Sequence, residues 1–441
     1  MRKALGQCFL GSLAIALGLT TTIPSFAQTT SDAVVAMEQS FEREFETYFG
    51  RDLATVTQSP AEMGATLARM GAETDTKPAV IWAMSREDHL HLVLVTSTGE
   101  PIVRDLYDVP QEKLEAIASR FTQSLTNPRR PFDQETARQL YQWLLEPFEL
   151  DFLRPEEIDT ILFCLGDGLR GIPLAALHDG DRFLIEKYAL TRIPAFNLIA
   201  HEYGDIQRGN ILAMGASKFE ELSPLPAVPL ELATIVKQGR SPLPTQTPRQ
   251  KLSILNDDFT GVDLQALLSN RQFDIVHFAT HADFLAGRPS ESYIQFYDQK
   301  VTLEDIPKFN WHQANVDLLV LSACRTAVGD GEAELGFAGL ALQLGINSAI
   351  ATLWNISDAG TLTLMGDFYQ ELSLQNTKAE ALRQAQLTLL KGDVNFDGDR
   401  LLLARGSIVP IPASLSDQIP TAEELKHPYY WAGFSMISSP W

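Results

Sequence analysis

Strand-like segments that are apolar on both faces recur through the second part of this chain, and they constrain the fold more than any other feature. After residue 136 they alternate with helix-like segments. A strand with no polar face needs cover on both sides, which the helices of a parallel sheet supply. We therefore expect an α/β domain built on a mostly parallel sheet flanked by helices. The expected strands are residues 159–164, 183–193, 210–215, 273–280, 292–297, 316–322 and 347–354.

Three helices are expected between and after these strands, from apolar residues at helical spacing. The first carries Leu335, Ala338 and Leu342 on its apolar face and can end at Gly345. The second has Ser357 or Asp358 as its N-terminal cap, and the third covers residues 377–391 before Gly392.

The first part of the chain is predicted to form a smaller unit, because 441 residues exceed the roughly 250–300 over which one core usually grows. Residues 31–49 show helical spacing, residues 79–95 read as a β-hairpin with a third strand after it, and residues 110–125 as a helix. The proline-containing stretch 126–131 marks the boundary. We expect an N-terminal α+β subdomain at residues 28–135 and the main domain at residues 136–441.

The N-terminus has the pattern of a secretory signal peptide. Arg2 and Lys3 precede an apolar run from Phe9 to Leu19, and Ser25-Phe26-Ala27 offers a small-x-small cleavage site. We predict a signal peptide at residues 1–27 and a protein that is exported, to the periplasm or the extracellular space. No later segment reaches 18 uninterrupted apolar residues, so we expect no membrane association after cleavage.

The acidic charge balance limits the classes of partner. The formal net charge is −21, which disfavours nucleic acid and anionic membrane surfaces. The composition does not distinguish a monomer from an oligomer.

Two reactive side chains follow neighbouring apolar segments. His281 ends residues 274–281, and Cys324 ends residues 316–324. Reactive groups collect beyond the carboxyl ends of parallel strands, so the imidazole and the thiol are expected to meet. A thiol is a modest nucleophile until a base such as histidine promotes the thiolate. The backbone amides of Cys324 and Ala282 would then face the negative charge that develops on a carbonyl oxygen.

Other interpretations of these residues are open. Cys164, within an apolar run, is either a small core hydrophobe or, in an oxidising compartment, the disulfide partner of Cys324. His277 lies in the middle of a strand, which favours a hydrogen-bonded core histidine. Zinc shared by His277, His281 and Cys324 is disfavoured because no fourth ligand is evident.

Several longer segments resemble the CHAT family, caspase-related cysteine peptidases of the clan that includes separase and the gingipains. The resemblance covers residues 136–441. The segments that carry it are GDGLRGIPLAALHDG (166–180), HFATHADF (277–284), VLSACRTAVGDG (320–331), GFAGLALQLGINSAIATLWNISD (336–358), MGDFYQEL (365–372), EALRQAQ (380–386) and HPYYWAGFSMI (427–437).

The resemblance implies a caspase-like fold and an endopeptidase that acts on protein or peptide substrates through a thioester acyl-enzyme. It assigns the nucleophile to Cys324 and the general base to His281. The histidine lies 43 residues before the cysteine, close to the roughly 50 typical of caspases. Ala282 departs from the glycine usual after the histidine and would be strained at a positive φ. The alternative is a catalytically silent CHAT domain that acts as a protein-interaction or regulatory module.

The substrate pocket has fewer indications. Relatives that cleave after basic residues often carry aspartate two positions before the cysteine, where this chain has Ser322. Asp358 is then the best candidate to line the pocket, with Trp354 or Asn355 as its wall. The competing hypothesis is that Asp358 caps the helix that begins near Ala359.

A calcium half-motif lies in residues 392–426, which look like an insertion. Its spacing matches the opening of an EF-hand loop, but Ala404 replaces the bidentate acid at the twelfth position. We therefore favour a solvated acidic turn over a calcium site, and expect no other cofactor. The residues concerned are Asp393, Asn395, Asp397 and Asp399.

Overall fold

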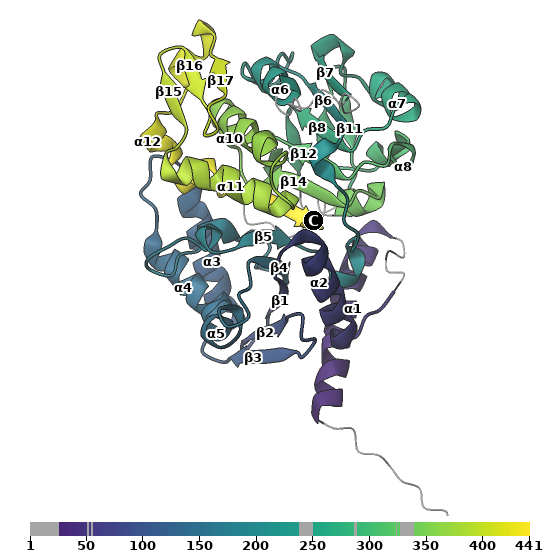
Figure 1. Cartoon of the computed structure of the whole chain (residues 1–441), viewed down its shortest axis with the longest axis vertical. Coiled ribbons are helices and arrows are strands. Elements are labelled where there is room, and N and C mark those ends of the chain that lie inside the picture. The colour runs from purple at the N-terminus through teal and green to yellow at the C-terminus, as the bar shows by residue number, and fades with distance from the viewer. Residues whose placement is uncertain are drawn as a thin grey trace, which may run out of the picture.

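The computed structural model describes residues 26–50, 53, 56–237, 250–285, 289–322, 324–326 and 339–441. Its centre is one eleven-stranded sheet with helices on both faces (Figure 1). The strands of this sheet are β1 (Pro78–Ser85), β2 (Leu90–Val95), β3 (Ile102–Leu106), β4 (Thr160–Leu165), β5 (Ala189–Arg192), β6 (Ile211–Gly215), β7 (Lys251–Leu255), β8 (Ile275–Ala279), β12 (Leu318–Leu321), β14 (Ser348–Thr352) and β18 (Phe434–Ser438).

The strand order is β3-β2-β1-β4-β5-β18-β14-β12-β8-β6-β7. Neighbours are antiparallel at β1–β2, β2–β3 and β14–β18 and parallel at the other junctions. The central strands β4, β6, β8, β12 and β14 are buried along their whole length, as two-sided cover requires. The expected α/β class with a mostly parallel sheet is confirmed.

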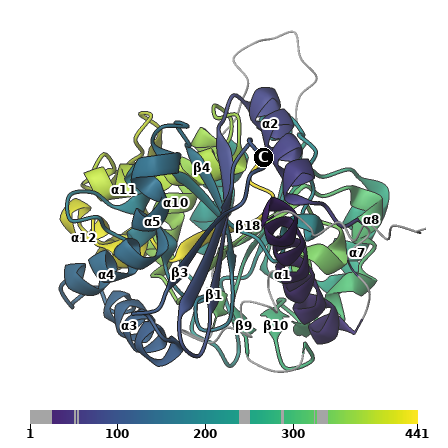
Figure 2. The ribbon, with the colours of Figure 1, turned by 90° about the horizontal axis from the view of Figure 1, so that it is seen from below.

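The helices divide between the two faces of the sheet (Figure 2). One face is covered by α3, α4, α6, α10 and α11, and the other by α1 and α2 over the N-terminal strands and by α7 and α8 over the C-terminal ones. Their bounds, with those of two short helices, are α1 (Phe26–Phe49), α2 (Pro60–Thr74), α3 (Gln111–Leu125), α4 (Gln134–Leu144), α5 (Glu146–Phe148), α6 (Val228–Lys237), α7 (Gly261–Asn270), α8 (Trp311–Ala314), α10 (Asp358–Glu371), α11 (Lys378–Lys391) and α12 (Ala422–Leu425).

The predicted helix ends agree with the structure where it describes them. The Ser357 hydroxyl accepts the backbone N–H of Gly360 and so caps α10, while α11 ends at Gly392 with a φ of +75°. Residues 339–344 are helical and stop at Gly345, which has a φ of +69°. Leu335 and Ala338, predicted on the same helix, lie outside the described residues.

The N-terminal strands differ from the expected small separate sheet. The hairpin and third strand are present as β1, β2 and β3, but β1 also pairs in parallel with β4, with Trp82 opposite Cys164. They therefore extend the central sheet. Both faces of β1 are buried, which explains why an isolated small sheet is not formed. The sequence limit of the subdomain at residue 135 stays a prediction.

The two halves of the sheet meet at β5 and β18 through a short junction. Their pairing places Ile437 opposite Arg192, a buried arginine. The Arg192 Nε–H donates to the Ser435 hydroxyl at 2.9 Å, and its terminal nitrogens donate to the carbonyls of Arg170 and Ile172. Side-chain hydrogen bonds thus supplement a junction with little backbone pairing.

Two small sheets stand beside the central one. The first has the order β11-β10-β9-β13, from β9 (Ala282–Phe284), β10 (Tyr293–Gln295), β11 (Lys300–Thr302) and β13 (Cys324–Thr326). The strand predicted at residues 292–297 is β10, so it belongs here and not to the central sheet. The second has the order β15-β16-β17, from β15 (Asn395–Asp397), β16 (Arg400–Leu402) and β17 (Ile408–Pro410).

The predicted signal peptide falls mostly on residues 1–25, outside the described residues. The expected helix at residues 31–49 is confirmed as part of α1, which already begins at Phe26. A helix with the length and apolarity needed to cross a membrane is not found in the described part of the chain.

A buried carboxyl group holds α1 on the sheet. Glu38 has no exposed surface, and its carboxyl accepts the Trp82 indole N–H and the Asn197 backbone N–H, each at 2.8 Å. Burial raises the pKa of Glu38 to about 7. The two donors compensate part of the cost of burying this group.

We predict that Trp82→Phe lowers the free energy of unfolding by about 1–3 kcal/mol, because it leaves a buried carboxyl oxygen without its donor. Urea unfolding followed by circular dichroism measures this. Tyr107→Phe on the exposed edge is the control and should change stability by less than about 0.5 kcal/mol. Equal stability of the two variants would contradict the anchoring role of Glu38.

Candidate active site

Two neighbouring parallel strands bring Cys324 and His281 to the same edge of the sheet. β8 and β12 pair in register, with Phe278 opposite Leu321. Beyond their carboxyl ends, the segments that follow the two strands pair again as β9 and β13, with Cys324 opposite Ala282. Paired strands lie about 4.8 Å apart, so the backbone of Cys324 lies beside the residue that follows His281. For Cys324 the structure describes the backbone alone.

A backbone carbonyl orients the ring of His281. The His281 Nε2 lies 2.8 Å from the carbonyl oxygen of Ser223, and the Phe219 ring packs on the imidazole with 4.8 Å between centroids. A carbonyl oxygen can only accept, so Nε2 carries the hydrogen and donates it. When the ring is neutral, Nδ1 is then the nitrogen with the free lone pair, the atom that can take a proton.

The loop that supplies this carbonyl follows β6, the strand next to β8. Its ends are drawn together where the Leu225 N–H donates to the Ser217 carbonyl at 3.1 Å. Sequence reasoning gave residues 223–229 no part in the site, so the contribution of the Ser223 carbonyl was missed. The available signal was position, because a loop at the carboxyl end of a neighbouring parallel strand reaches the same crevice.

Ala282 lies in an extended strand, so the expected strain of a positive φ does not arise there. It belongs to β9, is 5% exposed, and is not among the non-glycine residues with positive φ. An alanine is therefore compatible with the backbone at this position.

Cys164 and His277 are structural residues. Cys164 is a free, fully buried thiol whose Sγ donates to the Pro194 carbonyl at 3.3 Å, and burial raises its pKa. The disulfide with Cys324 is therefore wrong for this structure. His277 is buried between Glu231 at 3.0 Å and the Tyr369 hydroxyl at 3.1 Å, which confirms the hydrogen-bonded core histidine.

Asp358 contacts the same loop that positions His281. Its Oδ2 accepts the backbone N–H of Ala227 at 2.5 Å, just before α6. Burial raises the pKa of Asp358 to about 7, and the nearby charge of Glu231 acts in the same direction. The helix-cap hypothesis for Asp358 is wrong, because the hydroxyl of Ser357 caps α10.

The other predicted pocket residues are placed differently from one another. Trp354 is 2% exposed and donates its indole N–H to the Tyr429 carbonyl at 3.0 Å, so its ring has almost no surface for a substrate. Asn355 is exposed, and its carbonyl accepts the Tyr429 hydroxyl at 2.8 Å. Ser322, two residues before Cys324, is 1% exposed, and its hydroxyl has no partner among the described residues.

The calcium half-motif folds as a β-hairpin. Asn395 and Asp397 belong to β15, and Gly398, with a φ of +61°, turns the chain into β16. Within the described residues, the carboxylates of Asp393, Asp397 and Asp399 do not converge on one point as metal ligands would. The segment is therefore a β-hairpin, and the preference for a solvated acidic turn over a calcium site stays a prediction.

We predict that Asp358→Asn makes stability less dependent on pH. A pKa raised above its unfolded value means that the folded state holds the Asp358 proton more tightly than the unfolded state does. The resulting contribution to the free energy of unfolding is fully present below about pH 4 and is lost as pH rises through about 7. Asparagine carries no such proton and can still accept from Ala227. Between about pH 5 and about pH 8 the free energy of unfolding of the wild type should fall by on the order of 1–3 kcal/mol more than that of the variant.

Thermal and urea unfolding at several pH values measures this difference. Asp298→Asn, at an exposed aspartate, is the matched control and should follow the wild type. If the stability of wild type and of Asp358→Asn depended on pH in the same way, the raised pKa of the Asp358 carboxyl would be contradicted.

Comparison with known proteins gives one family and several distant structures. The CHAT domain matches residues 134–439. Separase from the Saccharomyces cerevisiae separase–securin complex is 11% identical with a TM-score of 0.47, over 86% of this chain and 31% of the separase chain. The chain thus spans about a third of the length of that separase.

Two gingipain structures are also similar. The complex of Porphyromonas gingivalis RgpB pro- and mature domains is 11% identical, with a TM-score of 0.39 over 75% of this chain and 77% of that one. The Arg-specific cysteine proteinase gingipain R is 10% identical, with a TM-score of 0.40 over 75% of each chain. No curated protein matches the sequence. Because the matched region is well over half of its length, the chain belongs to the CHAT domain family.

Proposed function

We propose that this chain is an exported cysteine endopeptidase with Cys324 as nucleophile and His281 as general base. The observation that carries the proposal is the pairing of β13 with β9, which places the Cys324 backbone beside Ala282. The hydrogen bond from His281 to Ser223 adds a defined orientation of the imidazole. Family membership supports the assignment of peptidase chemistry to these two residues.

The reaction follows from the properties of the two groups. The Cys324 thiol gives its proton to Nδ1 of His281, and the thiolate attacks the carbonyl carbon of the scissile peptide bond. The backbone N–H groups of Cys324 and Ala282 are the proposed donors to the oxyanion of the tetrahedral intermediate. Its collapse breaks the C–N bond, and the leaving amine takes the proton from His281. Water then hydrolyses the thioester and releases the second product.

The Ser223 carbonyl assists this proton transfer. It accepts the Nε2 hydrogen of His281 and so leaves Nδ1 as the nitrogen that can take the proton from the thiol. The loop from Ser217 to Ala227 therefore acts as a positioning element. Asp358 is proposed to act with it, through the Ala227 N–H, and not as the charged floor of a substrate pocket.

The substrate is proposed to be a protein or peptide whose residue before the scissile bond is uncharged. At the position where a carboxylate would select a basic residue, this chain has the buried hydroxyl of Ser322. The Asp358 carboxyl accepts a hydrogen bond from the Ala227 backbone N–H, so it is not free to bind a basic side chain. Of the predicted pocket residues, Asn355 has an exposed side chain to offer. A cleavage profile on a peptide library, with Cys324→Ala beside the wild type, gives the preference directly.

We predict that Cys324→Ala abolishes peptide cleavage and that His281→Ala lowers kcat/KM by about 10²–10⁴-fold, the usual contribution of a general base. Assays need a reductant, because an oxidised thiol is no nucleophile. Ser223→Ala is the matched control and should keep activity, since its carbonyl and not its hydroxyl contacts His281.

Cleavage by Cys324→Ala at the wild-type rate would contradict the assignment of Cys324 as the nucleophile. The alternative function, a catalytically silent CHAT domain that binds or regulates other proteins, predicts a different result. In that case a thiol-directed active-site probe would not label reduced wild-type protein, and no library peptide would be cut.

We predict that the exported protein begins at Gln28. Cleavage after Ala27 removes the first two residues of α1 and leaves its contacts through Glu38 in place. N-terminal sequencing of protein recovered outside the cytoplasm measures this, and Ala27→Arg should block processing because the cleavage site needs small residues. Unprocessed wild-type protein found in the cytoplasm would contradict export.

A further inference from the structure

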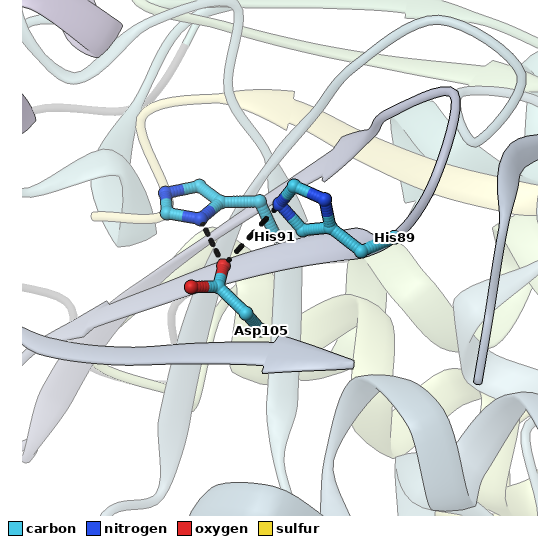
Figure 3. A group of neighbouring side chains, drawn as sticks. All are labelled: His89, His91 and Asp105. Atoms are coloured by element: carbon cyan, nitrogen blue, oxygen red, sulfur yellow. Dashed lines mark hydrogen bonds and ion pairs between the residues drawn. The ribbon is translucent and has the colours of Figure 1, made fainter. Parts of the chain in front are cut away.

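Two histidines and an aspartate meet at the far edge of the central sheet. His89 directly precedes β2 and His91 lies within it, so the two side chains, two residues apart, lean to one face. Asp105 is on the neighbouring strand β3, directly opposite His91 in the pairing register. Figure 3 shows both imidazoles directed at the same carboxylate.

The separations of the three side chains are compatible with one shared metal ion. The His91 Nδ1 donates to one Asp105 oxygen at 2.6 Å, a hydrogen that a bound cation would displace, and the His89 Nε2 lies 3.5 Å from the same oxygen. One ligand atom from each residue lies within 4.8 Å of the other two. Ligands at about 2.0–2.1 Å from a tetrahedral zinc are roughly 3.4 Å apart, so the His89–Asp105 separation already fits and the His91–Asp105 pair has to widen by under about 1 Å.

A fourth residue prepares one histidine for this role. The Asp88 carboxylate accepts a hydrogen from Nδ1 of His89 at 2.6 Å. With Nδ1 protonated, the lone pair of the neutral ring is on Nε2, the atom that faces Asp105. A carboxylate behind a histidine is the arrangement that orients imidazole ligands and raises their basicity in zinc sites. The Tyr107 ring, 4.9 Å from the His89 ring, limits its rotation further.

We propose that His89, His91 and Asp105 bind a divalent cation of the zinc type. Two imidazoles and one carboxylate are the ligand set of open tetrahedral zinc sites, in which water takes the fourth position. The three side chains are partly exposed, at 19%, 24% and 35%, so the ion can enter from solvent.

The cation site is separate from the proposed catalytic centre. Between β2 and β8 the sheet order places β1, β4, β5, β18, β14 and β12. The bound ion joins β2 to β3, the edge strand, and therefore stabilises this end of the sheet. His91 also lines a cavity of about 810 Å³ under the N-terminal half of α1, beside Met37 and Val103, so the same ion fixes one wall of that cavity.

Isothermal titration of untagged full-length protein with zinc chloride tests the proposal. The Cys324→Ala background is used, so that the proposed catalytic thiol cannot hold the ion. We expect one ion per chain, and a loss of affinity of 100-fold or more in His91→Ala and in Asp105→Asn. Asp88→Asn should weaken binding by about 10–100-fold, because it removes only the orienting partner.

Asp108→Asn, an exposed aspartate three residues after Asp105, is the matched control and should bind as before. Cobalt provides a second readout, since its visible absorption bands should appear on binding and be absent in His91→Ala. Melting temperatures without metal show whether each variant is folded, and His89→Gln replaces any that is not. Absence of binding by the parent protein, or equal binding by folded His91→Ala and Asp105→Asn, would overturn the proposal.

Discussion

The parallel pairing of β8 with β12 is the interaction on which the arrangement of the candidate active site depends. Parallel neighbours end at the same edge of a sheet, and here both chains continue and pair a second time as β9 and β13. The second pairing holds Cys324 opposite Ala282 by backbone hydrogen bonds. Side-chain identity at either position is therefore not required for the two segments to meet.

The histidine is positioned by a different kind of contact. Its orientation depends on the loop after β6, which reaches it through the Ser223 carbonyl and the Phe219 ring. The same loop ends at Ala227, whose N–H is held by Asp358 at the start of α10. A chain of neighbours therefore connects a buried carboxyl in a helix with the imidazole that is proposed to move the proton. Substitutions in α10 that do not contact His281 can therefore still alter its orientation through this loop.

Much of the sheet could be predicted from sequence because its central strands are apolar on both faces. β7 was missed because Lys251–Leu255 is short and half-exposed at the sheet edge and lacks the continuous apolar run of the central strands. Its alternation of polar and apolar residues, the pattern of a half-buried strand, was the available signal. The predicted strand at residues 183–193 was too long, since its regular strand is Ala189–Arg192 and Leu184–Glu186 form a short 3-10 helix. The separate N-terminal sheet was wrong because sequence periodicity does not reveal that β1 pairs with β4, a strand about 80 residues away.

The candidate site shows a similar division. His281 and Cys324 could be recognised because reactive side chains follow apolar segments, but the Ser223 carbonyl is backbone and has no residue signature. Asp358 could be identified as unusual, yet its contact with Ala227 depends on how α6 and α10 pack. The His89-x-His91 pattern was present in the sequence, and strand alternation alone would place both rings on one face. Its third member, Asp105, required the register of β2 and β3.

The place of β18 in the sheet sets an order on how the protein can fold. This strand follows the other strands of the described residues along the chain, yet it lies in the middle of the sheet between β5 and β14. Until residues 434–438 have been synthesised, β5 and β14 each have an open edge, and such edges invite pairing with other chains. Closing the sheet then requires contacts between residues more than 240 positions apart, such as Thr191 with Ser438, which slows folding. A nascent chain of this protein in which β18 is not yet inserted therefore exposes two strand edges that favour pairing with other chains.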